Sequence, residues 1–286
     1  MLVNVKGILK KAQAGGYAVG LFNTTDTDML EGVIAAAEEL NSPIIIGTAE
    51  VLLPYGELKL LGPALVDAAK RAKVPVAVNF DHGLTFERCV EALQTGFSAL
   101  MYDGSAKGYK QNVRETREMV EIAHMMGVSV EGEIGHVGQA SDNSYEKHDG
   151  PVAEREDMYT TPEEAKEFLR LTGVDALAVA IGTAHGEYKS KPVLNLKRLQ
   201  EIRAAVDVPL VLHGGSGLSD DDFRNCIKCG IAKVNIFTDI CLAGAKATAE
   251  GLSQGLGYLE LRNKKVNDIK EATLAKLRLF GSENKA

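Results

Sequence analysis

Short apolar runs, many of them rich in β-branched residues, alternate along this chain with longer segments of helical periodicity. Nearly continuous apolar runs are typical of strands that are buried on both faces of a parallel sheet. They read YAVGLF (17–22), PIIIG (43–47), PVAVNF (75–80), FSALMY (97–102), VSVEGE (128–133), DALAVAI (175–181), VPLVLH (208–213) and IAKVNI (231–236). Because parallel strands need helical crossovers, eight such units predict an α/β fold of the (β/α)8 TIM-barrel type.

The segments between the runs carry helix-start signals. TTPEEAKEFLRL has a Thr followed by Pro and glutamates, and LSDDDFRNCIKCG begins with Ser and aspartates that suit the positive end of a helix dipole. The pattern NDIKEATLAKLRLF predicts an additional C-terminal helix. No GxGxxG follows the first strand, which disfavours a dinucleotide-binding sheet. Since no linker composition is visible, we expect residues 1–286 to form a single TIM-barrel domain.

Composition and charge narrow the functional classes. The 286 residues are 45% hydrophobic and 25% charged, with a net charge of −7. The densest basic run, RNKK at 262–265, is short, so we expect no nucleic-acid partner. No segment approaches the roughly 18–20 apolar residues that span a bilayer, and the N-terminus lacks the apolar stretch of a signal peptide. We therefore expect a cytoplasmic protein with no membrane partner.

The cysteines do not form the pattern of a disulfide framework in a chain of this length. Cys226 and Cys229 make a CxxC motif, which could serve a metal or redox site. However, no second such pair exists, and the motif lies in a predicted helix that ends at Gly230. A structural role is favoured.

Three of the six histidines follow predicted strands, where the active sites of TIM barrels lie. They are His82, His185 and His213, after the third, sixth and seventh strands. A single histidine there could be an ordinary polar rim residue. Three on one closed ring predict a metal site, because three neutral imidazoles leave one open position on a tetrahedral ion, as in catalytic zinc sites.

Carboxylates accompany these histidines. Asp103 follows the fourth strand, and Glu131 and Glu133 share one face of the fifth strand because side chains alternate with a period of two. Such carboxylates could orient the imidazoles, hold a second metal position or transfer protons.

Asp81 and His82 are adjacent at the end of the third strand. In a continuous strand, neighbouring side chains point to opposite faces, so these two could not share one site. A shared site therefore requires the backbone to turn there, and Gly83 permits such a turn.

Two loops offer groups that suit an anion. HGGSGL after the seventh strand presents backbone N–H groups and the Ser216 hydroxyl, and VNIFTD after the eighth adds Asn235 and Thr238 at a helix start. TIM barrels commonly bind phosphate at these two loops. The sequence thus predicts a phosphate site beside the metal site, with Asn23 at the end of the first strand.

The motifs FDHG, MYDGS, VEGEIG, GTAHG, VLHGGSG and KVNIFTD, in this order, resemble those of the class II, metal-dependent ketose-bisphosphate aldolases, which include fructose- and tagatose-bisphosphate enzymes. The resemblance runs from GYAVGLFN to RLFGS, nearly the whole chain. It implies Zn²⁺ held by His82, His185 and His213, and Asp81 as the catalytic acid/base. An alternative metal position falls at Asp103 and Glu133. The substrate and its phosphate would contact Asn23, Gly186, Lys189, Gly214, Gly215, Ser216, Asn235 and Thr238.

This resemblance implies reversible cleavage of a ketose 1-phosphate or 1,6-bisphosphate to dihydroxyacetone phosphate and an aldehyde, through a zinc-stabilised enediolate. It also implies a homodimer or homotetramer, and a monovalent cation (Na⁺ or K⁺) assists in several relatives. Two alternatives remain open. A phosphosugar isomerase or epimerase could use the same metal-stabilised enediolate, and an aldolase-like subunit could have lost catalysis.

The chain departs from the family pattern at three places. Where the loop after the fifth strand usually carries a catalytic glutamate, this chain has Ser141, and nearby acids could substitute: Asp142, Glu146 or Asp149. Val266 stands where the family usually offers an arginine for the second phosphate, with three basic residues nearby: Arg262, Lys264 and Lys265. Asn79 replaces a frequent histidine. All three changes concern the aldehyde half of the site or the loop, so we expect an acceptor that could differ from glyceraldehyde 3-phosphate.

Overall fold

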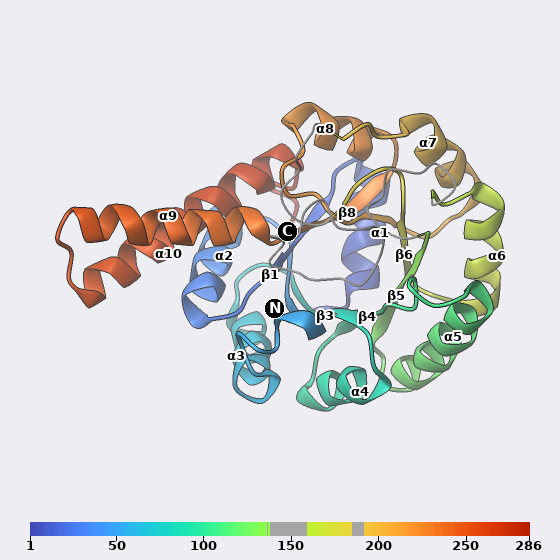
Figure 1. The fold of residues 1–286 in the computed structure, drawn as a ribbon, viewed down its shortest axis with the longest axis horizontal. Coiled ribbons are helices and arrows are strands. Elements are labelled where there is room, and N and C mark those ends of the chain that lie inside the picture. Colours follow the sequence, from blue (N-terminus) through green and yellow to red (C-terminus); the bar gives the residue numbers. More distant parts are fainter. Residues whose placement is uncertain (136, 138–158, 185–191) are drawn as a thin grey trace.

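Eight parallel strands close into a barrel in which each strand pairs with the next and β8 pairs with β1 (Figure 1). The computed structural model describes residues 1–135, 137, 159–184 and 192–286. The strands are β1 Val19–Asn23, β2 Ile44–Ala49, β3 Val76–Gly83, β4 Ala99–Tyr102, β5 Ser129–Ile134, β6 Ala176–Val179, β7 Leu210–Leu212 and β8 Ile231–Ile236. The predicted TIM barrel and the order of its strands are confirmed. The largest difference in bounds is at β3, which extends through Asp81 and His82 to Gly83.

Helices cover the outside of the barrel between consecutive strands (Figure 1). They are α2 Thr27–Glu39, α3 Leu58–Arg71 with a preceding 3-10 turn η1 Glu50–Leu52, α4 Phe86–Thr95, α5 Tyr109–Met125, α6 Pro162–Thr172, α7 Leu196–Ala205 and α8 Asp220–Lys228. The predicted starts of two helices are confirmed, because Thr161 and Ser219 form capping boxes at α6 and α8.

Two helices follow the last strand. Helix α9 (Thr238–Ser253) runs outward from β8, and α10 (Tyr258–Leu279) returns to pack against α9 and α2. Together they form a hairpin that projects from the side of the barrel (Figure 1). The predicted additional C-terminal helix is α10.

The N-terminal end of the barrel is closed by α1 (Val5–Gly15). The buried face of α1 packs on side chains that point into the barrel, several of them alanines: Ala77, Ala99, Ala176 and Ala178. The larger apolar core lies between the strands and the outer helices. At the N-terminal end of the barrel, small side chains leave room for α1. At the C-terminal end of the strands, the interior is filled by polar residues.

Cys226 and Cys229 lie at the C-terminal end of α8 and are buried as free thiols. Within the described part of the chain, neither belongs to a cluster of potential metal ligands. Both side chains belong to the apolar core between strands and outer helices, and their structural role stays a prediction.

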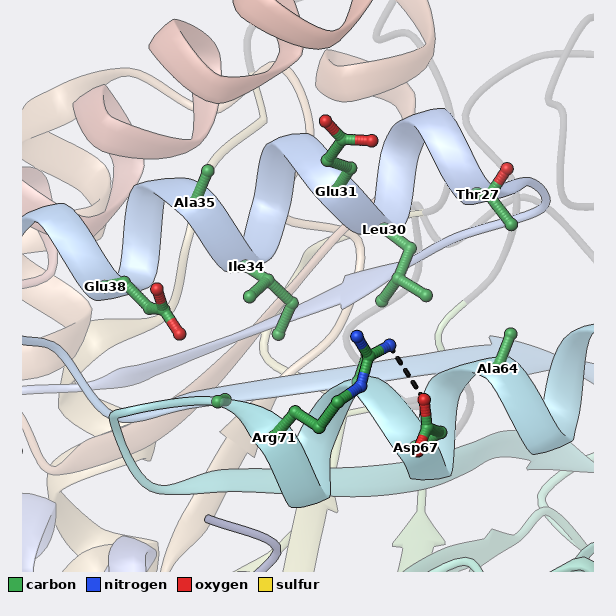
Figure 2. Close-up of a pocket in the computed structure, with 11 residues that line it drawn as sticks. Thr27, Leu30, Glu31, Ile34, Ala35, Glu38, Ala64, Asp67 and Arg71 are labelled. Atoms are coloured by element: carbon green, nitrogen blue, oxygen red, sulfur yellow. Dashed lines mark ion pairs between the residues drawn. The ribbon is translucent and has the colours of Figure 1, made fainter.

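A groove of about 530 Å³ lies on the outer surface between α2 and α3 (Figure 2). Ile34 and Ala64 line it, as do Asp67 and Arg71 of α3, which form an ion pair at 2.7 Å. None of the predicted site residues contributes to this groove, so the chemistry must be sought at the strand ends. Among the described helices, none combines the length and the apolar character needed to cross a membrane.

Candidate metal centre and active site

The backbone turns at the end of β3, which is required if the side chains of Asp81 and His82 are to lie in one site. His82 has a φ of 41°, in the left-handed region, and the pairing of β3 with β4 shifts register between Phe80 and Gly83. Left-handed backbone in a non-glycine residue costs about 1–2 kcal/mol, so the surrounding contacts must impose it. The turn is made by His82 rather than by Gly83. Glycine at 83 is needed for space, because a Cβ there would lie 2.4 Å from the Cys89 sulfur.

The imidazoles of His82 and His213 are in contact at the C-terminal end of the barrel strands. His213 Nδ1 lies 2.8 Å from His82 Nε2, and both side chains are buried. The outer nitrogen of each ring meets a carboxylate: His82 Nδ1 lies 2.8 Å from Asp103 Oδ2, and His213 Nε2 lies 2.8 Å from Glu131 Oε1. Carboxylates on the outer nitrogens turn the remaining lone pairs inward, an arrangement that commonly surrounds histidine metal ligands.

Two overlapping groups of potential ligand atoms occur among the described residues. The first is Asp81, His82 and His213, and the second is His82, Asp103 and Glu133; in each, the atoms lie within 4.8 Å of one another. The donor set of imidazole and carboxylate suits Zn²⁺. The second group coincides with the alternative metal position expected from the sequence.

Electrostatics around His82 favour a cation. Burial lowers the pKa of His82, but the carboxylates of Asp81 and Asp103 outweigh burial and raise it to about 10. A proton and a metal ion compete for the same imidazole lone pair, so the negative potential that favours one also favours the other.

Asp81 is buried close to this imidazole pair and accepts hydrogen bonds from three carboxamides. Asn23 Nδ2 donates to Oδ2 at 2.8 Å, and Asn235 Nδ2 lies 3.0 Å from both carboxylate oxygens. Asn79 Nδ2 donates to Oδ1 at 3.4 Å. Burial raises the pKa of Asp81, but the positive charges of His82 and Lys233 outweigh it and hold the pKa below its usual range. The group is therefore an anion at neutral pH, as a general base must be.

Glu133 and Asp103 differ in ionisation. Burial and the charge of Asp103 raise the pKa of Glu133 to about 8. Burial also opposes ionisation of Asp103, but its hydrogen bond with His82 outweighs burial and lowers the pKa of Asp103. Near neutral pH, one carboxyl of this pair is ionised and the other retains a proton.

The loops after β7 and β8 differ as anion sites. Helix α8 begins with the Ser219 capping box and has three aspartates in its first turn. The cap already occupies an N-terminal amide, and the aspartates' negative charges would repel an anion. Helix α9 begins at Thr238 without any side-chain cap. Between β7 and α8, Gly214 has a φ of 63° and a Cβ there would meet the backbone of Ala184 at 2.5 Å. The uncapped start of α9 is thus the more favourable of the two for a phosphate.

Some predicted residues lie outside the described part of the chain. These are the metal-ligand candidate His185, the phosphate-site candidates Gly186 and Lys189, and the loop residues Ser141, Asp142, Glu146 and Asp149. Direct side-chain contacts bring five described candidates into one cluster: Asn23, Asp81, His82, His213 and Asn235. Gly215 and Ser216 lie in the loop after β7 and Thr238 is the first residue of α9; all three are buried.

Two residues that the structure connects to this cluster had no role assigned from the sequence. Lys233 lies in β8 with its Nζ 2.6 Å from Glu131 Oε2. The available signal was a lysine inside the otherwise apolar run IAKVNI. Asn79, singled out only as a departure, was two residues before Asp81 on the same strand face, which is the spacing that brings the two side chains together.

A closed parallel barrel with buried imidazoles and carboxylates at the carboxyl ends of its strands defines a TIM-barrel enzyme. The chain matches the family described as "Fructose-bisphosphate aldolase class-II" over residues 3–285. It is 41% identical over 286 residues to the Escherichia coli protein YdjI and 38% identical over 312 residues to a fructose-bisphosphate aldolase of Thermus caldophilus, with full coverage of all chains. The crystal structure of the YdjI aldolase superposes with a TM-score of 0.88, at 38% identity and full coverage of both chains. The chain belongs to the class II fructose-bisphosphate aldolase family, and it is an aldolase, a carbon–carbon lyase.

Proposed function

We propose that this enzyme cleaves a ketose phosphorylated at C1, a 1-phosphate or a 1,6-bisphosphate, into dihydroxyacetone phosphate and an aldehyde, and that it requires Zn²⁺. The observation that carries the proposal is the facing pair of imidazoles, each with a carboxylate on its outer nitrogen, beside an ionised Asp81. A base next to a cation site is what carbon–carbon cleavage by acid–base chemistry needs.

His82 and His213 would hold the metal ion through the nitrogens that face each other, with His185 as the expected third ligand. Asp103 and Glu133 offer the alternative position that shares His82. Bound Zn²⁺ would supply Lewis-acid stabilisation of the enediolate that the broken bond leaves on the ketone fragment. By family resemblance, we include a monovalent cation, Na⁺ or K⁺, in this proposal.

Asp81 would remove the proton from the C4 hydroxyl of the substrate as the C3–C4 bond breaks. The C4 oxygen then becomes the aldehyde carbonyl, the electron pair remains on the dihydroxyacetone phosphate fragment, and a proton returns to C3. The amides of Asn23 and Asn235 orient the Asp81 carboxylate for this transfer. Asn235 Oδ1 has no hydrogen-bond partner among the described residues, so it can accept a hydrogen bond from a substrate hydroxyl.

The C1 phosphate would bind between the glycine-rich loop and the uncapped start of α9. Gly214, Gly215 and Ser216 would offer backbone N–H groups and a hydroxyl, and Thr238 would add the N-terminal amides of its helix. Gly186 and Lys189 complete this proposed set.

The basic residues close in sequence to Val266, where the family usually offers an arginine for the second phosphate, already pair with carboxylates. Arg262 pairs with Asp28 at 3.1 Å, Lys264 with Asp268 at 2.8 Å, and Lys265 with Asp28 at 2.7 Å. Side chains held by carboxylates are poor ligands for a second phosphate in the same subunit. This supports an acceptor aldehyde that differs from glyceraldehyde 3-phosphate.

A homodimer or homotetramer is part of the proposal. Tyr258 and Leu259 are 83% and 70% exposed at the start of α10, and Leu252 in the last turn of α9 is exposed as well. Large apolar side chains exposed in this way favour burial against another subunit. Light scattering should give at least twice the 30.6 kDa chain mass, and a monomer would contradict this part of the proposal.

The test is an aldol condensation screen with dihydroxyacetone phosphate and a panel of phosphorylated and unphosphorylated aldehydes. We expect product formation that a chelator abolishes and Zn²⁺ restores, and activity that survives complete metal removal would refute the zinc requirement. In the cleavage direction, a coupled dehydrogenase should detect released dihydroxyacetone phosphate, which an isomerase or epimerase would not produce. A kcat/KM of about 10⁴ M⁻¹s⁻¹ or above for fructose or tagatose 1,6-bisphosphate would count against an altered acceptor.

A further inference from the structure

A lysine is buried inside the barrel below the metal centre. The Lys233 side chain is fully buried in β8, and its Nζ lies 2.6 Å from Glu131 Oε2 of β5. Isolated charges are costly to bury, so a lysine and a glutamate at this depth must compensate each other. Stability alone does not account for such a pair, because apolar residues of similar volume are often as stabilising or more so.

The glutamate of this pair reaches the metal centre. Its second oxygen, Oε1, accepts a hydrogen bond from His213 Nε2 at 2.8 Å. With its proton on Nε2, the His213 ring directs the lone pair of Nδ1 toward His82 Nε2, 2.8 Å away. The chain of contacts therefore runs from Lys233 through Glu131 to the face of His213 that meets the cation site.

We infer that Glu131 and Lys233 are positioning residues for metal binding: Glu131 holds the tautomer and orientation of His213, and Lys233 holds Glu131. The inference rests on the proposed metal function and assigns to the pair an effect on metal affinity. Partners of this kind typically contribute 10- to 100-fold to metal affinity. Removing the pair should lower metal affinity by that factor even when the fold is intact.

The chain contains a matched control at the opposite end of the barrel. Asp175, just before β6, accepts from His124 Nε2 at 2.8 Å and pairs with Lys6 Nζ at 2.9 Å. This trio has the same lysine–carboxylate–histidine composition but lies at the N-terminal ends of the strands. Asp175→Asn should therefore leave metal affinity unchanged.

Two variants of the buried pair separate positioning from stability. Glu131→Gln replaces the anionic acceptor with a neutral amide. The double variant Glu131→Leu/Lys233→Met removes both charges together and leaves an apolar contact that should retain the fold. Thermal unfolding of each metal-free protein measures stability independently of the metal.

Metal affinity is measured by titrating the metal-free proteins with Co²⁺, followed by its visible absorption, and by chelator competition with Zn²⁺. We expect affinity to fall 10- to 100-fold in Glu131→Gln and in the double variant, with an altered Co²⁺ spectrum, whereas Asp175→Asn matches the wild type. If the double variant folds and binds Co²⁺ within about twofold of the wild type, the inference is wrong and the proposed function stands. If the wild type itself binds neither metal, the proposed function fails as well.

A measurement on the wild type covers the case in which the variants do not fold. Nitrogen-15 NMR of histidine-labelled, Zn²⁺-loaded protein should show His213 with a proton on Nε2 and none on Nδ1. A proton on Nδ1 of His213 would overturn the inference without any substitution.

Discussion

Replacing Asp81 with Asn tests the base at the centre of the proposed reaction. The substitution keeps the size of the side chain but removes its charge and turns one carboxylate oxygen into an N–H donor. That donor would face an amide N–H of Asn23, now at 2.8 Å, or of Asn235, now at 3.0 Å. Donors left without an acceptor in a buried site cost about 1–3 kcal/mol, so we expect a loss of stability of this size.

The effect on catalysis should be larger than the effect on stability. A general base contributes about 10²- to 10⁴-fold to a rate, equivalent to about 3–5 kcal/mol of barrier. Since His82 and His213 are unchanged, Asp81→Asn should still bind Zn²⁺.

The assay is kcat for release of dihydroxyacetone phosphate, together with zinc content by elemental analysis and thermal unfolding. Asp67→Asn, at the exposed pair with Arg71 in the outer groove, is the matched control and should retain wild-type kcat. A kcat for Asp81→Asn within tenfold of the wild type would refute the role of base. Zinc lost in parallel with activity would instead identify Asp81 as a metal ligand.

Substitutions at His82, Asn79 and Glu115 test other contacts of the structure. His82→Ala should lose bound zinc and all chelator-sensitive turnover, and a variant that keeps stoichiometric zinc would contradict the proposed ligand set. Asn79→Ala removes the 3.4 Å contact to Asp81, the longest of the amide contacts, and should lower kcat only about fivefold, as expected for a contact worth about 1 kcal/mol; an unchanged kcat would show that this amide does not support the base. Glu115→Gln tests pH dependence: burial raises the pKa of Glu115, but hydrogen bonds from Lys107 and Tyr102 outweigh it and lower the pKa from 4.5 to about 2. Because the folded-state pKa is depressed, this stabilisation is fully present above about pH 4.5 and is lost as the pH falls toward 2. Urea unfolding should find the variant about 1–2 kcal/mol less stable at pH 7 and the difference closing near pH 2, whereas a difference that does not change with pH would refute the charge-based account.

The sequence by itself determined the elements and their order. Continuous apolar runs predicted β1 to β8, and the Thr161 and Ser219 capping signals predicted the starts of α6 and α8. These features depend on neighbours within a few residues, so they can be read without the fold. Their positions at strand ends also identified three candidate site residues, Asp81, His82 and His213, because a closed barrel places the carboxyl ends of all its strands on one face.

Only the tertiary structure decided which of these side chains meet. His213 and His82 are 131 residues apart, Lys233 and Glu131 are 102 apart, and Asn235 and Asp81 are 154 apart. Their contacts depend on the register of strands on opposite sides of the ring, which no local pattern specifies. The left-handed backbone of His82 is likewise an outcome of packing, since the sequence offered Gly83 as the more permissive turn residue. A strand pattern fixes which face a side chain points to, but only closure of the barrel sets the distance across it.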